Sequence, residues 1–336
     1  MNLLKLRVFK LVLLLAVAAT MPSVIKAQTP MTEIPLGSGG GAGGAQSMAS
    51  GALLDGGELG GGGTAAGTTG PEAVAFDGTY FWVATQFNDT ITRVRASDGV
   101  VSGSFKVGKR PVALLYANGS LWVANLLSDN VMKVSPSTGA IAATYTVGGG
   151  PGGLAFDGAS IWVASRDGNN VTKLKATNGS NQGTFAVGNR PIGLAFAGNN
   201  IWVANNKSNS VTRLSTAGAV LGTYSVDKGP FGVAAEGENI WITNYFGKSL
   251  TKLRASDGFN LGTFNVGDGA AGIAFDGTSL WVVCNGDSTL VKVSPSDGTV
   301  VTTYVTGKGP FSVALGGSKV FVSNFASNSV STAAAN

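Results

Sequence analysis

The chain has 336 residues, with 51 glycines, one cysteine, no histidine and only 12% charged residues. Without histidine, Ser-His-Asp catalysis, Cys-His catalysis and histidine-ligated zinc are excluded. One cysteine cannot form an internal disulfide. The formal net charge of +5 suggests a basic protein until the N-terminus is considered separately.

The first 27 residues are typical of a secretory signal peptide. Lys5, Arg7 and Lys10 precede an apolar run over residues 11–19, and the small residue Ala27 suits a cleavage site. The run is shorter than the roughly 20 residues that span a bilayer, so export is favoured over a transmembrane anchor. Cleavage would leave 19 basic and 18 acidic residues. We therefore expect a secreted or periplasmic protein, or one associated with the cell surface, with no nucleic-acid binding.

A glycine-rich segment follows, with 15 glycines in positions 37–70. Such a segment cannot bury enough apolar surface to offset its ordering entropy. We expect residues 38–70 to form a flexible segment. A phosphate-binding glycine loop is disfavoured, because no Lys-Ser/Thr pair or strand-to-helix context accompanies the glycines.

From residue 71 the sequence repeats with a period of about 40 residues. Each repeat begins at a proline, replaced by Ala270 in the sixth, and the six tryptophans keep the same spacing, with Phe321 as the seventh member. The prolines are Pro71, Pro111, Pro151, Pro191, Pro230 and Pro310, and the tryptophans are Trp82, Trp122, Trp162, Trp202, Trp241 and Trp281. Seven units of this length predict an all-β, seven-bladed β-propeller over residues 71–336.

Each unit divides into four strand-like pieces. In the third unit these are 151–156, 161–165, 171–174 and 183–188, separated by turn residues such as Asp157-Gly158. Polarity rises along the unit, so we place the proline strand nearest the axis and the last strand at the rim. Small residues two positions after each proline mark, such as Gly153 and Gly193, should let the blades converge at the axis.

The pattern around residues 187–214 resembles bacterial YVTN-type β-propeller repeats. Trp202-Val-Ala-Asn205 and Trp241-Ile-Thr-Asn244 stand where that family has its Tyr-Val-Thr-Asn signature. The resemblance covers all seven units and implies the fold, whereas propellers of this type serve as binding platforms, surface-layer components and enzymes. Streptogramin (virginiamycin B) lyases look similar in repeat and blade number, but the histidine on which their activity depends has no counterpart here.

The seventh unit ends near Asn336 after three strands. Residues 33–37, Glu-Ile-Pro-Leu-Gly, match the outer-strand pattern of the other units. We expect residues 32–37, within an N-terminal segment 28–37, to complete the seventh blade, where Pro35 is tolerable at an edge. The segment beginning Gly63-Thr64-Ala65 is a weaker alternative.

Several conspicuous residues have a structural interpretation. We expect the tryptophans to pack between blades rather than to stack on sugars, and Cys284 to be a packed thiol rather than a nucleophile. Turn geometry explains Asp77, Asp157 and Asp276. In the loops that follow the tryptophan strands, we favour Asx turns over calcium binding.

The candidate site is one face of the disc, formed by the loops before each proline and after each tryptophan strand. The sequence varies there while the rest repeats, although unselected loop residues would also differ. Arginine, amide and aromatic side chains suit recognition of an anionic or polar partner. The candidate residues are Glu72, Arg110, Arg166, Arg190, Asn206, Phe231, Tyr245, Phe311 and Phe325.

Two functions remain open. We favour an exported, non-catalytic binding or scaffold propeller, monomeric and without cofactor or metal, whose partner is a protein, a glycan or a small polar molecule. The alternative is a lyase or hydrolase at the mouth of the central channel, with Glu72 or Asp167 as base and Arg166 or Arg190 stabilising an anion. A carboxylate of raised pKa contacting an arginine in the mouth would favour the enzyme, and a shallow polar face would favour binding.

Overall fold

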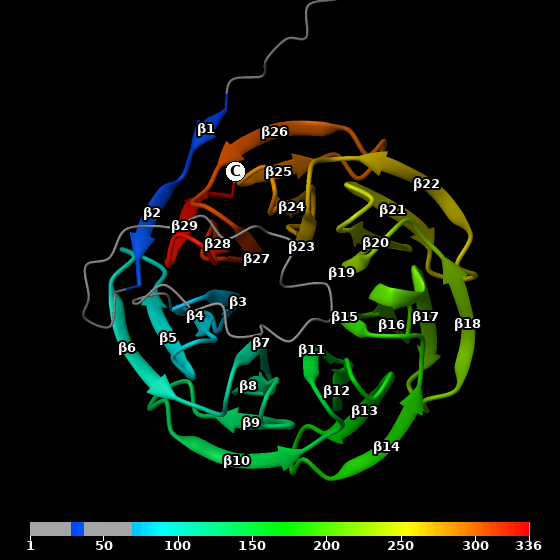
Figure 1. The fold of residues 1–336 in the computed structure, drawn as a ribbon, viewed down its shortest axis with the longest axis horizontal. Helices are drawn as coiled ribbons and strands as arrows, with labels where there is room; N and C mark the ends of the chain where they lie inside the picture. Colours follow the sequence, from blue (N-terminus) through cyan, green and yellow to red (C-terminus); the bar gives the residue numbers. More distant parts are fainter. Residues whose placement is uncertain (1–27, 37–68, 336) are drawn as a thin grey trace, which may run out of the picture.

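The structure, a computed structural model, describes residues 28–36 and 69–335. Residues 1–27, 37–68 and 336 lie outside this range. They include the expected signal peptide, Gly37 of the expected closing strand, most of the glycine-rich segment and the alternative closing strand at 63–65. Within the described residues, seven sheets surround a central axis (Figure 1). The predicted all-β, seven-bladed propeller is confirmed.

The blades are numbered here from 1 to 7 in chain order. Blade 1 consists of β3 (Pro71–Phe76), β4 (Tyr80–Thr85), β5 (Thr90–Arg95) and β6 (Val101–Lys106). Blade 2 consists of β7 (Pro111–Ala117), β8 (Ser120–Asn125), β9 (Asn130–Val134) and β10 (Ile141–Thr146). Blade 3 consists of β11 (Pro151–Phe156), β12 (Ser160–Ser165), β13 (Asn170–Lys175) and β14 (Asn181–Ala186).

Blade 4 consists of β15 (Pro191–Ala197), β16 (Asn200–Asn205), β17 (Ser210–Ser215) and β18 (Val220–Ser225), with a 3-10 turn, η1 (Asn206–Ser208), between β16 and β17. Blade 5 consists of β19 (Pro230–Glu236), β20 (Asn239–Asn244), β21 (Ser249–Arg254) and β22 (Asn260–Asn265). Blade 6 contains β23 (Ala270–Phe275), β24 (Leu280–Cys284), β25 (Thr289–Val293) and β26 (Val300–Val305). Blade 7 contains β27 (Pro310–Gly316), β28 (Lys319–Asn324) and β29 (Ser329–Ala334).

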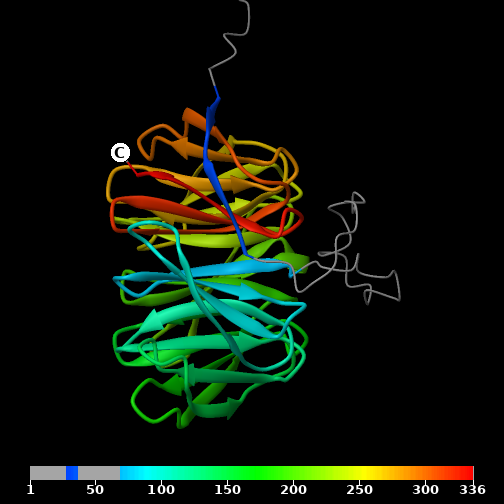
Figure 2. The same cartoon turned by 90° about the vertical axis from the view of Figure 1, so that its left-hand side faces the viewer.

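Two short N-terminal strands close the ring. β2 (Thr32–Pro35) pairs antiparallel with β29 and is the fourth strand of blade 7. β1 (Thr29–Pro30) pairs in parallel with β26 and adds a fifth strand to blade 6, a pairing that the sequence pattern does not indicate. Figure 2 shows both strands along the outer wall of the disc. Ile34 also packs with the core between blades 7 and 1, so the N-terminal segment joins the last blade to the first.

The first strand of each blade lies at the axis and the last at the rim (Figure 1). Small residues are required where the first strands meet. A Cβ added at Gly153 would collide with the carbonyl oxygen of Ile192 in the next blade, and one at Gly193 would collide with that of Phe231. The convergence inferred from the sequence is therefore present in the structure.

The six tryptophans are fully buried, so they form the core and cannot stack on a sugar. Each ring packs on an aromatic residue of the outer strand of its own blade, with ring centroids 5.4–5.8 Å apart. In three blades the indole Nε1 also donates a hydrogen bond of 2.7 Å to the turn carboxylate of Asp77, Asp157 or Asp276. Cys284 is fully buried as well, and burial raises the pKa of its thiol to about 12, as expected of a packed residue.

A basic residue of the third strand faces each tryptophan, and in at least five blades it also donates a hydrogen bond to the next blade. Lys133, for example, pairs with Trp122 in the register, lies 5.4 Å from its ring and donates to the carbonyl of Ala176 in the next blade. Blade 7 has Thr332 at this place, opposite Phe321. Lys319 takes over the contact and donates to the carbonyls of Ala96 and Ser97 in blade 1.

Where the tryptophan strands of blades 4 and 5 end, the buried amide of the last strand residue hydrogen bonds within its own blade. Asn205 donates to Ser210 and Thr212, and Asn244 donates to Ser249 and Thr251. Across the described ranges, no helix combines the length and apolar character needed to cross a membrane.

Candidate functional site

A cavity of about 190 Å³ opens at the centre of the disc, where the first strands of all seven blades meet. Its wall carries one branched aliphatic side chain per blade, three positions after each proline mark. These seven residues, which we call the aliphatic collar, are Val74, Leu114, Leu154, Leu194, Val233, Ile273 and Val313. Each blade therefore contributes an aliphatic residue at this level, and each of these residues also packs in a core between neighbouring blades.

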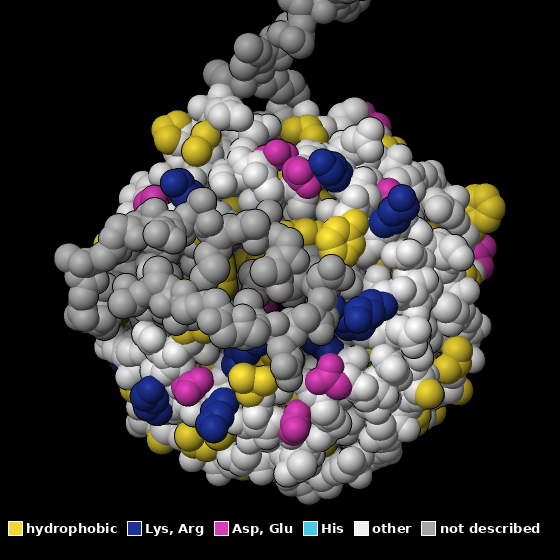
Figure 3. All heavy atoms as spheres, in the orientation of Figure 1, with side chains coloured by type: hydrophobic (Ala, Val, Ile, Leu, Met, Phe, Trp, Pro, Cys, Tyr) yellow, Lys and Arg dark blue, Asp and Glu magenta, His cyan; other side chains and the backbone are white. Residues whose placement is uncertain are grey.

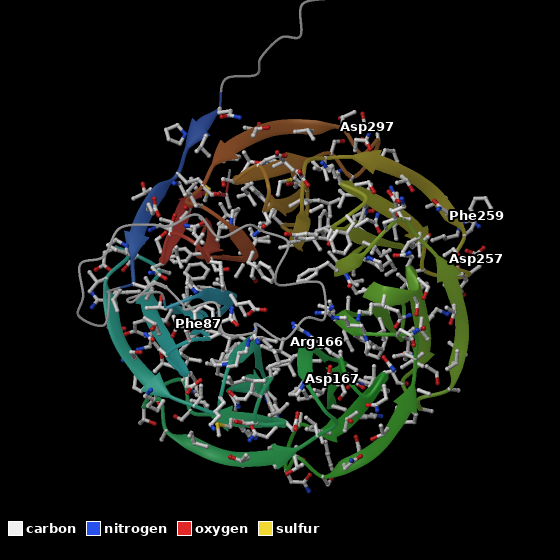
Figure 4. The ribbon with its side chains drawn as sticks, in the orientation of Figure 1. Phe87, Arg166, Asp167, Asp257, Phe259 and Asp297 are labelled. Atoms are coloured by element: carbon white, nitrogen blue, oxygen red, sulfur yellow. The ribbon has the colours of Figure 1, made fainter. Side chains whose placement is uncertain are left out.

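Polar groups enter the cavity from two blades. Glu72 of β3 and Arg166, which follows β12, both contribute to its lining. The Arg166 Nη2 and Glu72 Oε1 atoms are 3.8 Å apart, and the two side chains are only 12% and 7% exposed. Figure 4 shows Arg166 pointing into the central opening, whereas Asp167 lies farther out. A buried ion pair thus stands at the mouth of the channel.

The backbone of blade 3 makes room for Arg166. Position 152, which carries Glu72, Ile192 or Phe231 in other blades, is glycine here. A Cβ at Gly152 would collide with the side chain of Arg166. The guanidinium reaches the channel across this gap, so Gly152 and Arg166 act together.

Two further arginines flank Arg166 and hold an unusual backbone conformation. The residue before the first strand has a positive φ in every blade, and five blades use glycine there. Arg110 and Arg190 adopt φ values of 55° and 54° at this position in blades 2 and 4. The left-handed region costs a residue with a side chain about 1–2 kcal/mol. Strain of this kind is commonly found at functional sites.

The loops fix these arginines from the preceding blade. The backbone N–H of Arg110 donates to Asp89 Oδ1 at 2.9 Å, and that of Arg190 donates to Asn169 Oδ1 at 2.8 Å. The Arg110 side chain is held as well, since its Nε donates to Oε1 of buried Gln86 at 2.7 Å. Asx residues that the sequence indicates as turn formers therefore position the basic groups.

The charges at the mouth perturb one another. Burial raises the pKa of Glu72 above its usual value, and the positive charges of Arg166 and Arg110 only partly offset this effect. Burial likewise lowers the pKa of Arg166, to which Glu72 and Asp167 are the nearby anions and Arg190 and Arg110 the nearby cations. A guanidinium nevertheless stays protonated near neutral pH. Positive charge is in excess, and Figure 3 shows basic side chains near the centre of this face, over β7, β11 and β15.

The opposite side of the mouth is aromatic. Phe231 of β19 and Phe311 of β27 line the cavity and meet edge to face, with ring centroids 5.2 Å apart. Behind them Tyr245 is buried, and its hydroxyl donates to Asn285 Oδ1 at 2.9 Å. Tyr245 therefore supports the aromatic wall and does not face a ligand. Its burial raises the pKa of the phenol to about 12.

Two other candidate residues lie outside the cavity. Asn206 is buried, and its Nδ2 donates to the carbonyl of Pro230, where it ties blade 4 to blade 5. Phe325 packs edge to face against Phe87, with ring centroids 5.6 Å apart, at the junction of blades 7 and 1. The structure thus brings together Glu72, Arg166, Phe231 and Phe311 as cavity lining, and places Arg110 and Arg190 beside them.

Sequence reasoning missed the aliphatic collar and the role of Gly152. The collar has a sequence signal, namely a branched aliphatic residue at the same place in all seven repeats. That signal is also what packing between blades produces, so it does not by itself point to a cavity. No group of three or more Cys, Asp or Glu residues in segments 28–36 and 69–335 is placed to hold a metal ion.

No protein-family model matches this chain, and no curated protein does. Similar solved structures do exist. A streptogramin B lyase structure aligns with a TM-score of 0.70 and 17% sequence identity, covering 80% of this chain and 94% of that one. The hydrazine synthase of Kuenenia stuttgartiensis aligns with a TM-score of 0.74 and 19% identity, covering 83% and 99%. At these identities the likeness shows the propeller fold.

Proposed function

We propose that this protein is an exported binding propeller that holds a small anionic ligand at the mouth of its central channel. The cavity volume fits a small molecule, because it slightly exceeds the roughly 150 Å³ of a cavity that accepts benzene. Varied loop residues on a rigid repeated frame suit recognition.

The observation that carries this proposal is the placement of Arg110 and Arg190. Both occupy a left-handed position that five other blades give to glycine, and both flank the blade that supplies Arg166. Glycine adopts this conformation without the steric cost that a side chain adds, so the two arginines occupy positions where the backbone itself favours glycine. Three guanidinium groups around one opening attract an anion, and the low dielectric of a buried site strengthens that attraction.

A second candidate function is supported by the Glu72–Arg166 pair. A buried carboxylate of raised pKa beside an arginine meets the criterion for a general acid or base next to an anion-stabilising group. A lyase or hydrolase would use Glu72 for proton transfer and Arg166 for charge stabilisation. Asp167 is a weaker candidate for the base, because it lies away from the central opening (Figure 4).

Glu72→Gln separates the two functions. The protein is first purified from its native host, and the ligand that it carries is identified by mass spectrometry. The identified compound is then incubated with the unmodified and variant proteins. A binding protein leaves the compound intact in both cases and retains affinity in the variant. An enzyme converts the compound, and the variant stops the conversion while still binding.

Anion binding itself is tested by titrating the protein with acetate, benzoate and phosphate in separate calorimetric experiments. We expect at least one of these anions to bind, and Arg166→Gln to weaken its affinity at least tenfold. Lys175→Gln is the matched control, because Lys175 is an exposed cation in the same blade, and should leave affinity unchanged. Failure of all three anions to bind would remove the proposal.

Two finer proposals rest on the sequence. Membership of the YVTN-type repeat family is supported by the Trp-Val-Ala-Asn motifs. Export is supported by the basic and apolar character of residues 1–27. Sequencing the N-terminus of the protein from its native host tests export, which predicts a mature chain that begins at residue 28.

A further inference from the structure

We infer that the ligand is a monocarboxylate with a compact apolar body, bound with its carboxylate toward Arg166 and its body against Phe231, Phe311 and the aliphatic collar. This inference rests on the proposed anion site and specifies its chemistry. It follows from the different chemistry of the walls of one cavity, of which one is charged and the others are apolar.

The charged wall accepts one negative charge. Arg166 is the one arginine among the residues that line the cavity in the described part of the chain, while Arg110 and Arg190 add positive charge from the flanking loops. Glu72 already contributes a carboxylate 3.8 Å from the Arg166 guanidinium. A dianion such as phosphate would have to be desolvated next to this carboxylate, at a higher cost than a single charge. A monoanion is therefore favoured.

The guanidinium favours a planar carboxylate among monoanions. Its fork of donors matches the two oxygens of a carboxylate in a bidentate geometry. The present contact with Glu72 is longer than a hydrogen bond, and the Arg166 Nε is buried without an acceptor among the described residues. A small movement of the side chain toward a ligand carboxylate would give this donor a partner, which contributes favourably to binding.

The remaining walls favour an apolar body. Ile192, Phe231 and Phe311 border the mouth, and the seven collar residues continue the apolar surface below it. Ile192, Phe231 and Phe311 are only 3%, 8% and 6% exposed, and a ring or a branched chain would cover the small apolar surface that they still present, whereas acetate would leave it uncovered. Burying that surface stabilises the complex in proportion to its area. The cavity volume of about 190 Å³ accommodates one ring and excludes large ligands from complete burial.

The test compares four probes on the unmodified protein by calorimetry or ligand-observed NMR: benzoate, its neutral isostere benzamide, acetate and phosphate. We expect benzoate to bind at least tenfold more tightly than acetate and phosphate, and benzamide to bind at least tenfold more weakly than benzoate. Equal affinities for benzoate and acetate, or tighter binding of phosphate, would overturn the apolar monocarboxylate while leaving the anion site intact. Failure of every anion to bind would instead remove the proposed function.

A variant locates the apolar contact. Phe311→Leu shortens the aromatic wall and should weaken benzoate at least threefold with little effect on acetate. The control is Phe259→Leu, since Phe259 is 60% exposed and is absent from the cavity lining. An equal loss in both variants, or no loss in Phe311→Leu, would contradict the inferred orientation. If Phe311→Leu does not fold, the comparison of probes on the unmodified protein still decides the inference.

Discussion

Replacing Arg110 and Arg190 by glycine should weaken anion binding without weakening the fold. Glycine relieves a left-handed backbone that costs about 1–2 kcal/mol for each arginine, and this gain is reduced by about 0.4–1 kcal/mol of extra entropy in the unfolded chain. Arg110→Gly also loses the hydrogen bond to Gln86, worth about 1 kcal/mol. We expect the free energy of unfolding of each variant to stay within about 1 kcal/mol of the unmodified protein.

The affinity for an anion should fall in these variants, although the free energy of unfolding hardly changes. A guanidinium that acts from a partly solvated loop contributes on the order of 1 kcal/mol to the attraction of an anion, or about a fivefold change in affinity. The double variant should therefore bind benzoate about 25-fold more weakly if the two contributions add. Guanidinium chloride unfolding and benzoate titration on the same preparations measure both quantities.

Lys248→Gly is the control for backbone strain. Lys248 also has a positive φ, 56°, and its ammonium pairs with Asp268 rather than with the channel groups. This variant should relieve strain and leave benzoate affinity unchanged. The reasoning is refuted if the double arginine variant loses more than about 2 kcal/mol of stability, because the arginines would then be structural. Unchanged affinity in the double variant would refute their role in binding.

Three further predictions concern charge and closure. Benzoate affinity should rise as the pH falls toward the raised pKa of Glu72, because protonation removes the negative charge beside the ligand. Benzoate titrations at several pH values should show this dependence of affinity on pH, and Glu72→Gln should abolish it. Lys319→Met should lower the free energy of unfolding by about 1–2 kcal/mol, and adding Thr332→Lys should restore it in denaturant titrations; no recovery would contradict the role of this contact between blades. Removal of residues 28–36 should lower the melting temperature by about 5–10 °C, and an unchanged melting curve would contradict the closure.

The architecture could be predicted because the same physical requirement recurs seven times. Each blade needs a tryptophan between two sheets, a small residue near the axis and a turn before each strand. These needs give one sequence pattern per blade, and the pattern is easy to detect because it is repeated. β1 could not be predicted, because a strand of two residues has no alternation to detect. The hydrogen bond that the indole donates to a turn aspartate in three blades was missed for a similar reason, since Asp157 already has a sufficient role as a turn residue.

The candidate site was only partly predictable, because closing the ring determines which side chains meet. Glu72 and Arg166 belong to blades 1 and 3, and their contact depends on the side chain of Arg166 crossing the gap at Gly152. A variable loop residue can also point inward. Asn206 and Tyr245 vary among the repeats as a recognition surface would, yet both are buried in contacts between blades.

The most direct test of the anion site is a crystal structure of the protein grown with benzoate. We predict the carboxylate within about 3.2 Å of a guanidinium nitrogen of Arg166, with the ring against Phe231 and Phe311 over the aliphatic collar. Benzoate bound elsewhere on the disc, with the channel mouth unchanged, would contradict the account.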